Sequence, residues 1–178
     1  MLKDIKQQKK WIREQYRAIR KSINERYACY VAKSITNLFH QNLSDVKGKT
    51  VAAYIPIDGE INVLPLMYSL LDLGYKIAIP SKEKLLKFEE WNKSRGDIIP
   101  DIIITPVIAF DDHFHRLGFG GGWYDRMMQE LQPLGKIFIG MAYEKQYCKD
   151  LPTEKHDQRL DVIITETCVR YRNTLAII

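Results

Sequence analysis

Hydrophobic side chains follow a helical period in the first part of this 178-residue chain. Residues 4–40 contain no Gly or Pro, and apolar positions recur there every three or four residues, which predicts an amphipathic helix. The apolar positions are Ile12, Tyr16, Ile19, Ile23, Tyr27 and Tyr30. Lys9, Arg13 and Arg17 follow the same period, shifted by one residue. These cations should therefore line up along the helix next to its buried apolar face. A break is expected near Asn24.

From residue 48 onward, the pattern changes to short apolar runs rich in β-branched residues. The runs lie at 51–57, 76–80, 101–110, 136–143 and 161–165, with a last candidate at 174–178. Helix-like stretches separate them at about 62–73 and 122–132. This alternation predicts an α/β fold with a mostly parallel central sheet flanked by helices, preceded by a long basic N-terminal helix.

The domain organisation and the functional edge follow from this pattern. No repeat, linker or low-complexity tract interrupts the chain, so residues 1–178 are expected to form a single domain. Ligands of such sheets bind beyond the carboxyl ends of the strands. The loops at 57–62 and 110–122 are therefore the expected functional edge.

The positive charge is confined to one segment. The chain has 27 Lys+Arg against 22 Asp+Glu, a net charge of +5. Residues 1–33 hold ten of the cations and three of the acids, so this segment carries +7 and the remainder carries −2. A nucleic-acid-binding module that uses the basic helix is one interpretation, but it leaves the slightly acidic body of the protein unused.

Composition and cysteine usage narrow the class of protein. Hydrophobic residues make up 46% and charged residues 28%, as in ordinary globular domains. No apolar run approaches the roughly 20 residues that span a bilayer, and the N-terminus lacks the apolar core of a signal peptide. The three cysteines are far apart and form no CxxC motif. These features indicate a cytoplasmic protein in a reducing environment, with no membrane partner.

The most informative motif is a glycine loop between a strand-like run and a helix-like stretch. Four of the ten glycines, at positions 118, 120, 121 and 122, fall within five residues. Glycine lets backbone N–H groups converge on an anion, and the following helix N-terminus adds its positive dipole end. Arg116 adds a fixed cation, so phosphate is the expected ligand. Trp123 stands where the Rossmann pattern needs its third glycine, and no Lys follows to complete a Walker A motif.

The segment Arg116-Leu117-Gly118-Phe119-Gly120-Gly121-Gly122-Trp123-Tyr124-Asp125-Arg126, preceded by Ala109-Phe110-Asp111, resembles the signature of the 5-formyltetrahydrofolate cyclo-ligase family. Flanking segments agree in order and spacing. They are Lys9–Arg13, Tyr54–Glu60, Gln146, Leu151-Pro152 and His156-Asp157. The resemblance therefore covers nearly the whole chain, and its central motif is the specific part.

The resemblance implies an ATP-dependent enzyme of one-carbon metabolism. The family converts 5-formyltetrahydrofolate and ATP to 5,10-methenyltetrahydrofolate, ADP and phosphate. Phosphorylation of the formyl oxygen makes it a good leaving group, and N10 of the same folate then closes the ring. Since nucleophile and electrophile share one molecule, the enzyme chiefly positions them and neutralises charge.

The site residues carry over by position. Arg116 and Glu60 are the expected catalytic residues, and ATP and Mg²⁺ the expected cofactors. The nucleotide is expected to contact Lys9, Lys10, Arg13, Arg116, Leu117, Gly118, Phe119, Gly120, Gly121, Gly122, Trp123 and Tyr124. The folate, with or without further glutamates, is expected to contact Ile55, Glu60, Phe119, Gly120, Gly121, Gly122 and Trp123. Asp125 and Asp157 are the expected Mg²⁺ ligands, oxygen donors being what this hard ion prefers. A monomer without nucleic acid is expected.

Departures from the family and alternative readings remain at this point. Phe114 replaces a usual glycine, Val107 replaces another, and Trp123 replaces a commoner tyrosine. Without the family, the cations could be solvated helix charges, Asp125 a helix N-terminal acid and Glu60 a turn acid. A paralogue, or another phosphate-ligand enzyme such as a sugar-phosphate isomerase or acyl-CoA transferase, would also explain the loop. His113 and His115 lack the partners of a zinc site and are interpreted as solvated loop residues.

Overall fold

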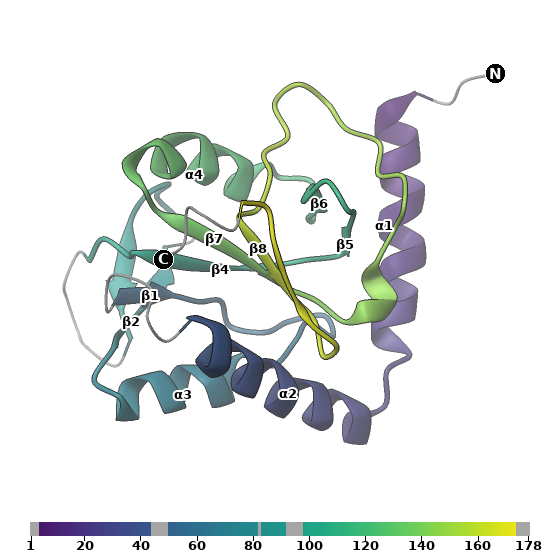
Figure 1. The fold of residues 1–178 in the computed structure, drawn as a ribbon. Coiled ribbons are helices and arrows are strands. Elements are labelled where there is room, and N and C mark those ends of the chain that lie inside the picture. Colours follow the sequence, from purple (N-terminus) through teal and green to yellow (C-terminus); the bar gives the residue numbers. More distant parts are fainter. Residues whose placement is uncertain (1–3, 44–49, 82, 92–97, 174–178) are drawn as a thin grey trace.

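The computed structural model describes residues 4–43, 50–81, 83–91 and 98–173, and Figure 1 shows their arrangement. The helices are α1 (Ile5–Lys21), α2 (Glu25–Leu43), α3 (Leu64–Asp72) and α4 (Trp123–Leu131), with the short 3-10 turns η1 (Gln132–Leu134) and η2 (Glu144–Gln146). The strands are β1 (Thr50–Ala52), β2 (Lys76–Pro80), β3 (Phe88–Glu90), β4 (Ile102–Pro106), β5 (Ala109–Phe110), β6 (Arg116–Leu117), β7 (Ile137–Met141), β8 (Val162–Ile164) and β9 (Val169–Tyr171).

Seven of these strands form the central sheet in the order β3-β2-β1-β4-β7-β8-β9. The five inner strands are parallel, and β3 and β9 are antiparallel edges. Strands β5 and β6 form a separate antiparallel pair that leads into the glycine loop. The α/β fold with a mostly parallel sheet is confirmed.

The sequence predicted the elements more accurately than their ends. The expected helix over 4–40 is interrupted at Ser22–Asn24, near the expected break, and the basic helix is the 17-residue α1. The run at 51–57 is a strand only as far as Ala52, because the chain then leaves the sheet as a loop. The short strands β3, β6 and β9 were not predicted, and the candidate strand at 174–178 lies outside the described residues.

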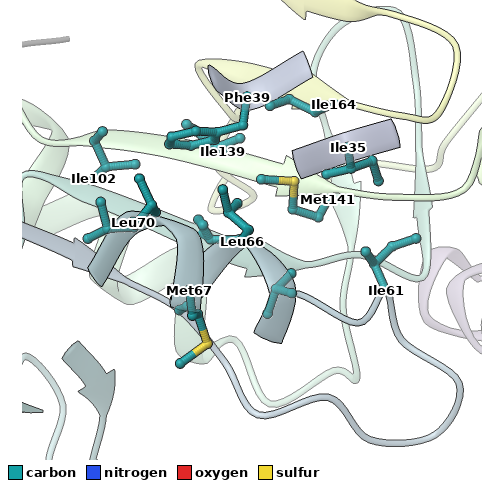
Figure 2. Packing of buried hydrophobic residues seen from close by; sticks show 14 of the residues in the cluster. Ile35, Phe39, Ile61, Leu66, Met67, Leu70, Ile102, Ile139, Met141 and Ile164 are labelled. Atoms are coloured by element: carbon teal, nitrogen blue, oxygen red, sulfur yellow. The ribbon is translucent and has the colours of Figure 1, made fainter. Parts of the chain in front are cut away.

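Helices cover both faces of the sheet. Side chains alternate along each strand, so Ile102 and Ile104 of β4 face α2 and α3, whereas Ile103 faces α4. Figure 2 shows the first of these layers, where Phe39 of α2 and Leu66 of α3 lie over the sheet. Because the inner strands are buried on both faces, they are apolar at nearly every position rather than alternating.

Helix α1 stands apart from both layers, at the side of the molecule where β5 and β6 lie (Figure 1). It packs through Ile12 against Ala109 and Leu117, and it also contacts η2. The loops that follow β1 and β4 end beside it, as its hydrogen bonds to Asp58 and Val107 show. Among the described residues, no helix is long and apolar enough to cross a membrane.

A cavity substitution should test this core. Ile139 of β7 is fully buried on the face of the sheet that α2 and α3 cover, and truncation to alanine removes contacts that the surrounding strands cannot replace. Ile139→Ala should lower the free energy of unfolding by about 2–5 kcal/mol, as measured by urea denaturation. The control Ile99→Ala, at a position that is 71% exposed, should change it by less than about 0.5 kcal/mol. Equal losses in the two variants would contradict the layer assignment.

Candidate active site

A cavity of about 610 Å³ opens between α1, the glycine loop and the segment that precedes β8. Its volume lies within the usual range for small-ligand sites. The lining residues are Lys6, Lys9, Arg13, Pro106, Arg116, Leu117, Gly118, Phe119, Gly120, Gly121, Gly122, Trp123, Tyr124, Asp125, Glu154, His156 and Asp157. The cavity thus lies beyond the carboxyl end of β4, where the sheet topology predicts a ligand site.

The glycine loop needs glycine at specific positions. Gly120 and Gly122 have φ angles of 100° and 61°, in the left-handed region that side chains disfavour. Gly122 directly precedes α4, so the loop leads into the N-terminus of this helix. A Cβ atom at Gly118 would lie 2.7 Å from a terminal nitrogen of Arg116. The loop therefore lies against α1 and Arg116 in a form that larger residues would prevent.

Arg116 is a buried cation beneath this loop, 8% exposed. Its Nη2 donates to Asp125 Oδ2 at 3.3 Å, and its guanidinium lies over the ring of Tyr124 at 5.2 Å. Its buried Nε has no hydrogen-bond partner among the described residues. Burial lowers the pKa of Arg116, although the carboxylate of Asp125 opposes this effect. An unsatisfied donor at the wall of a cavity is suited to an anionic ligand.

Two cations of α1 enter the cavity one helical turn apart. Arg13 donates from Nε to the carbonyl oxygen of Gly118 at 2.8 Å and so ties the helix to the glycine loop. Lys9 is only 6% exposed and donates from Nζ to Glu154 at 2.8 Å and to Asp157 at 2.5 Å. Burial alone would lower the pKa of Lys9, but the two carboxylates outweigh it and raise the pKa. Lys9 is therefore a charged ammonium in the cavity wall.

The acids of the cavity are already engaged by neighbours. Asp125 accepts from Arg116 and from the backbone N–H of Gln158, and Asp157 accepts from Lys9 and the N–H of Glu154. The Lys9 ammonium helps to hold the pKa of Asp157 below its ordinary value against the opposing effect of burial. Both acids line the cavity.

Glu60 lies on the loop after β1 and is 7% exposed. Its Oε2 accepts from the backbone N–H of Ile57 at 2.9 Å, while its buried Oε1 has no hydrogen-bond partner among the described residues. Burial raises the pKa of this carboxyl above its ordinary value. Ile55, on the same loop, is 44% exposed. A carboxylate oxygen without a partner can accept hydrogen bonds from the N–H groups of a ligand.

A cluster of cations fastens this loop to α1. Asp58 accepts hydrogen bonds from Arg17 and Arg20 and forms an ion pair with Lys21. The bonds from Arg17 and Lys21 hold the pKa of Asp58 far below its usual range. Arg17 and Arg20 also lie over the ring of Phe119, each at 5.6 Å. Phe119 therefore links the glycine loop to the same cluster.

The predicted residues fall into three groups. Most of them line the cavity, as the residues given above show. Ile55 and Glu60 do not line it and lie on the neighbouring loop, and Lys10 is exposed on α1 without lining it. Sequence reasoning missed Lys6 and Glu154, which do line it. Lys6 shares the helical period of Lys9 and Arg13, a signal that could have found it.

Two residues before the glycine loop correct the reading of the sequence. Phe114 has a φ of 66°, a conformation that glycine adopts freely, so a phenylalanine here carries backbone strain. His115 is not a solvated loop residue: its Nδ1 lies 3.0 Å from Asp111, and its Nε2 accepts from Arg159 at 3.1 Å. The sequence could not show these partners because Arg159 is 44 residues away.

Known proteins resemble this chain in both sequence and fold. The family model described as the 5-formyltetrahydrofolate cyclo-ligase family matches residues 86–166. The 5-formyltetrahydrofolate cyclo-ligase of Haemophilus influenzae is 30% identical over 89% of this chain and 98% of its own length. The protein of the same name from Escherichia coli K12 is 30% identical over 70% of this chain and 81% of its own.

Solved structures agree with these matches. The 5,10-methenyltetrahydrofolate synthetase of Aquifex aeolicus has a TM-score of 0.77 at 26% identity and covers 92% of each chain. The synthetase of Mycoplasma pneumoniae, also at a TM-score of 0.77, is 24% identical and supports the fold. The fold and the cavity define an α/β protein with a cation-lined cavity beyond the carboxyl end of β4. The chain belongs to the 5-formyltetrahydrofolate cyclo-ligase family, which confirms the resemblance of its central motif.

The raised pKa of Glu60 predicts a pH-dependent gain in stability on its replacement. The folded state binds the Glu60 proton more tightly than the unfolded state, so ionisation of this buried group costs stability as pH rises. Glu60→Gln should therefore raise the urea midpoint at about pH 7, and the gain should shrink as the pH falls and vanish toward about pH 3, below the ordinary pKa of Glu.

The matched control is Glu130→Gln, at an exposed position on α4. It should leave the midpoint unchanged to within the measurement at both pH values. A Glu60→Gln protein that is less stable than the wild type at about pH 7, or that shows the same difference at both pH values, would contradict the burial argument.

Proposed function

We propose that this protein catalyses the ATP-dependent conversion of 5-formyltetrahydrofolate to 5,10-methenyltetrahydrofolate, with release of ADP and phosphate. The single observation that carries the proposal is the cavity itself, in which Lys9, Arg13 and Arg116 converge on a glycine loop at a helix N-terminus. Membership of the cyclo-ligase family supports the same reaction.

The cationic half of the cavity suits the phosphates of ATP. Backbone N–H groups of Gly120–Gly122 and the N-terminus of α4 offer donors, and the orphan Nε of Arg116 offers a charged one. Lys9 and Arg13 approach the same space from α1. These groups would neutralise charge while the γ-phosphoryl group moves to the formyl oxygen and its bond to ADP breaks.

The neighbouring loop suits the folate. The orphan Oε1 of Glu60 can accept from the pterin N–H groups, and Ile55, Phe119 and Trp123 offer apolar surface for the ring. The folate's own N10 then attacks the activated formyl carbon, and phosphate leaves as the ring closes. The protein's task in this step is to hold both parts of one molecule in reacting geometry.

Asp125 and Asp157 are the proposed Mg²⁺ ligands. Both are partly exposed in the cavity, and carboxylate oxygens are the donors that this ion prefers, so the residues fit it. Bound there, Mg²⁺ would neutralise charge on the nucleotide phosphates. The backbone N–H of Gln158 orients Asp125, and that of Glu154 orients Asp157.

The proposal includes a cytoplasmic monomer of one domain over residues 1–178 that binds no nucleic acid. Support comes from the cations of α1, since Lys9, Arg13 and Arg20 bond to groups of this protein. A nucleic-acid surface would instead need them in solvent. The proposed substrate is 5-formyltetrahydrofolate with or without further glutamates. The form with one glutamate should be tested first.

The reaction can be followed by the absorbance of the methenyl product with ATP, Mg²⁺ and 5-formyltetrahydrofolate. The wild-type protein should form product only when ATP is present. Arg116→Ala should lower kcat/KM by about 100- to 1000-fold, because it removes a buried charge from the wall of the cavity proposed to hold the phosphates.

His115→Ala is the control, since His115 lies next to Arg116 in sequence but does not line the cavity. It should lower kcat/KM by less than about threefold if it acts only through stability. Folded wild-type protein that forms no ATP-dependent product would refute the proposed reaction. Equal losses in the two variants would refute the role of Arg116.

A further inference from the structure

We propose that Glu154, together with His156 and Asp157, forms a divalent-cation site that the Lys9 ammonium occupies until nucleotide phosphates draw it away. The inference rests on the ATP-binding role proposed above. It adds Glu154 and His156 to the ligand set and gives Lys9 a second role. Metal and nucleotide should consequently bind together rather than independently.

The three side chains already converge. One ligand atom from each, two carboxylate oxygens and an imidazole nitrogen, lies within 4.8 Å of the others. His156 Nε2 is 3.9 Å from both Glu154 Oε2 and Asp157 Oδ1. Oxygen donors with one imidazole suit Mn²⁺ and, through the carboxylates, Mg²⁺. All three residues line the nucleotide cavity.

A cation already occupies the position between the two carboxylates. The side chain of Lys9 is 7% exposed, and its Nζ bridges Glu154 Oε2 and Asp157 Oδ2 at 2.8 and 2.5 Å. Burial of an ammonium is costly unless it is paired in this way. Ile12, less than one turn further along α1, is buried against β5 and β6 and keeps this part of the helix in place. The site is therefore a built position for a cation rather than an open acidic loop.

Lys9 and a divalent ion cannot share this position. Like charges a few ångströms apart repel strongly at a partly buried site. One ammonium leaves the two carboxylates with a net charge of −1, whereas a divalent ion neutralises them completely. Loss of Lys9 without a replacement would leave two acids uncompensated, so Lys9 also stabilises the empty site.

Nucleotide phosphates can shift this balance because Lys9 lines the same cavity as Arg13 and the glycine loop. A triphosphate carries more negative charge than the two carboxylates together, so it competes for the Lys9 ammonium. The carboxylates are then free for a divalent ion that the phosphates also attract. Metal affinity should thus be low without nucleotide and higher with it, a positive coupling between two ligands.

Mn²⁺ binding to the full-length protein tests this exchange, with free Mn²⁺ counted by electron paramagnetic resonance. Without nucleotide, Lys9→Gln should bind Mn²⁺ about tenfold more tightly than the wild type, a typical size for coupled sites. Lys6→Gln removes the same charge from the same cavity but from a residue that no ion pair ties to these acids, and it should change the affinity less than threefold.

Two further variants exclude indirect effects. Lys9→Arg keeps the cation and should bind Mn²⁺ as weakly as the wild type. Adding Glu154→Gln to Lys9→Gln should abolish the tenfold gain. Circular dichroism of each variant checks that it is folded, and if Lys9→Gln is not, the effect of the ATP analogue on Mn²⁺ binding to the wild type remains the test.

Several results would overturn the inference. They are a Lys9→Gln protein that binds Mn²⁺ no more tightly than the wild type, an equal gain in Lys6→Gln, and a Lys9→Arg protein that gains affinity. A non-hydrolysable ATP analogue that binds the wild type without raising its Mn²⁺ affinity, once the Mn²⁺ that the analogue binds in protein-free solution is subtracted, would also do so. Failure of the analogue to bind at all would count against the proposed function, while the nucleotide-free comparison would still decide whether Lys9 excludes the metal.

Discussion

Arg20 carries a guanidinium group that is 1% exposed and bonded to two different loops. Its Nε and Nη2 donate to the carbonyl oxygen and the carboxylate of Asp58, after β1, and its Nη1 donates to the carbonyl oxygen of Val107, after β4. Both loops leave the carboxyl edge of the sheet. A buried charge held by several acceptors is costly to break, because loss of one partner strands the other. Arg20 therefore fixes α1 against this edge.

The rest of the site depends on that attachment. With α1 in place, Arg13 reaches the glycine loop and Lys9 reaches the acids before β8, so one helix contacts every wall of the cavity. The site also contains features that lower the stability of the fold and that a purely structural region would avoid. Glu60 and Arg116 each keep a buried polar atom that has no hydrogen-bond partner in the described part of the chain, and Phe114 keeps a left-handed backbone. Such departures are expected where a ligand supplies the missing contacts.

Local sequence patterns predicted the fold, and one motif predicted the site. A period of three to four residues predicted the helices, and short apolar runs rich in β-branched residues predicted the five inner strands. Strands β3, β6 and β9 were missed because they are two or three residues long and contain charged residues, so they do not form apolar runs. Glu154 was missed for a different reason: its partner Lys9 is 145 residues away, and pairing at that separation leaves no local pattern.

The cations of α1 show the same limit. Their spacing predicted that they share a side of the helix. It could not show that Arg17 and Arg20 bind Asp58, whereas Lys9 and Arg13 line the cavity. Nor could it show that Arg116 lies beneath Gly118 rather than in solvent. These contacts depend on tertiary packing. They show that the cations of α1 bind particular groups of the protein and do not form one cationic surface.

Amide hydrogen exchange of an Arg20→Gln protein tests most directly whether this one attachment assembles the site. The free energy of opening of the α1 amides should fall by about 3 kcal/mol, a rise in their exchange of roughly 100-fold, because the variant loses the buried charged bonds to both loops. The amides of β4 and β7 should keep the protection that they have in the wild type. Unchanged protection of α1, or an equal loss in all three elements, would contradict the account.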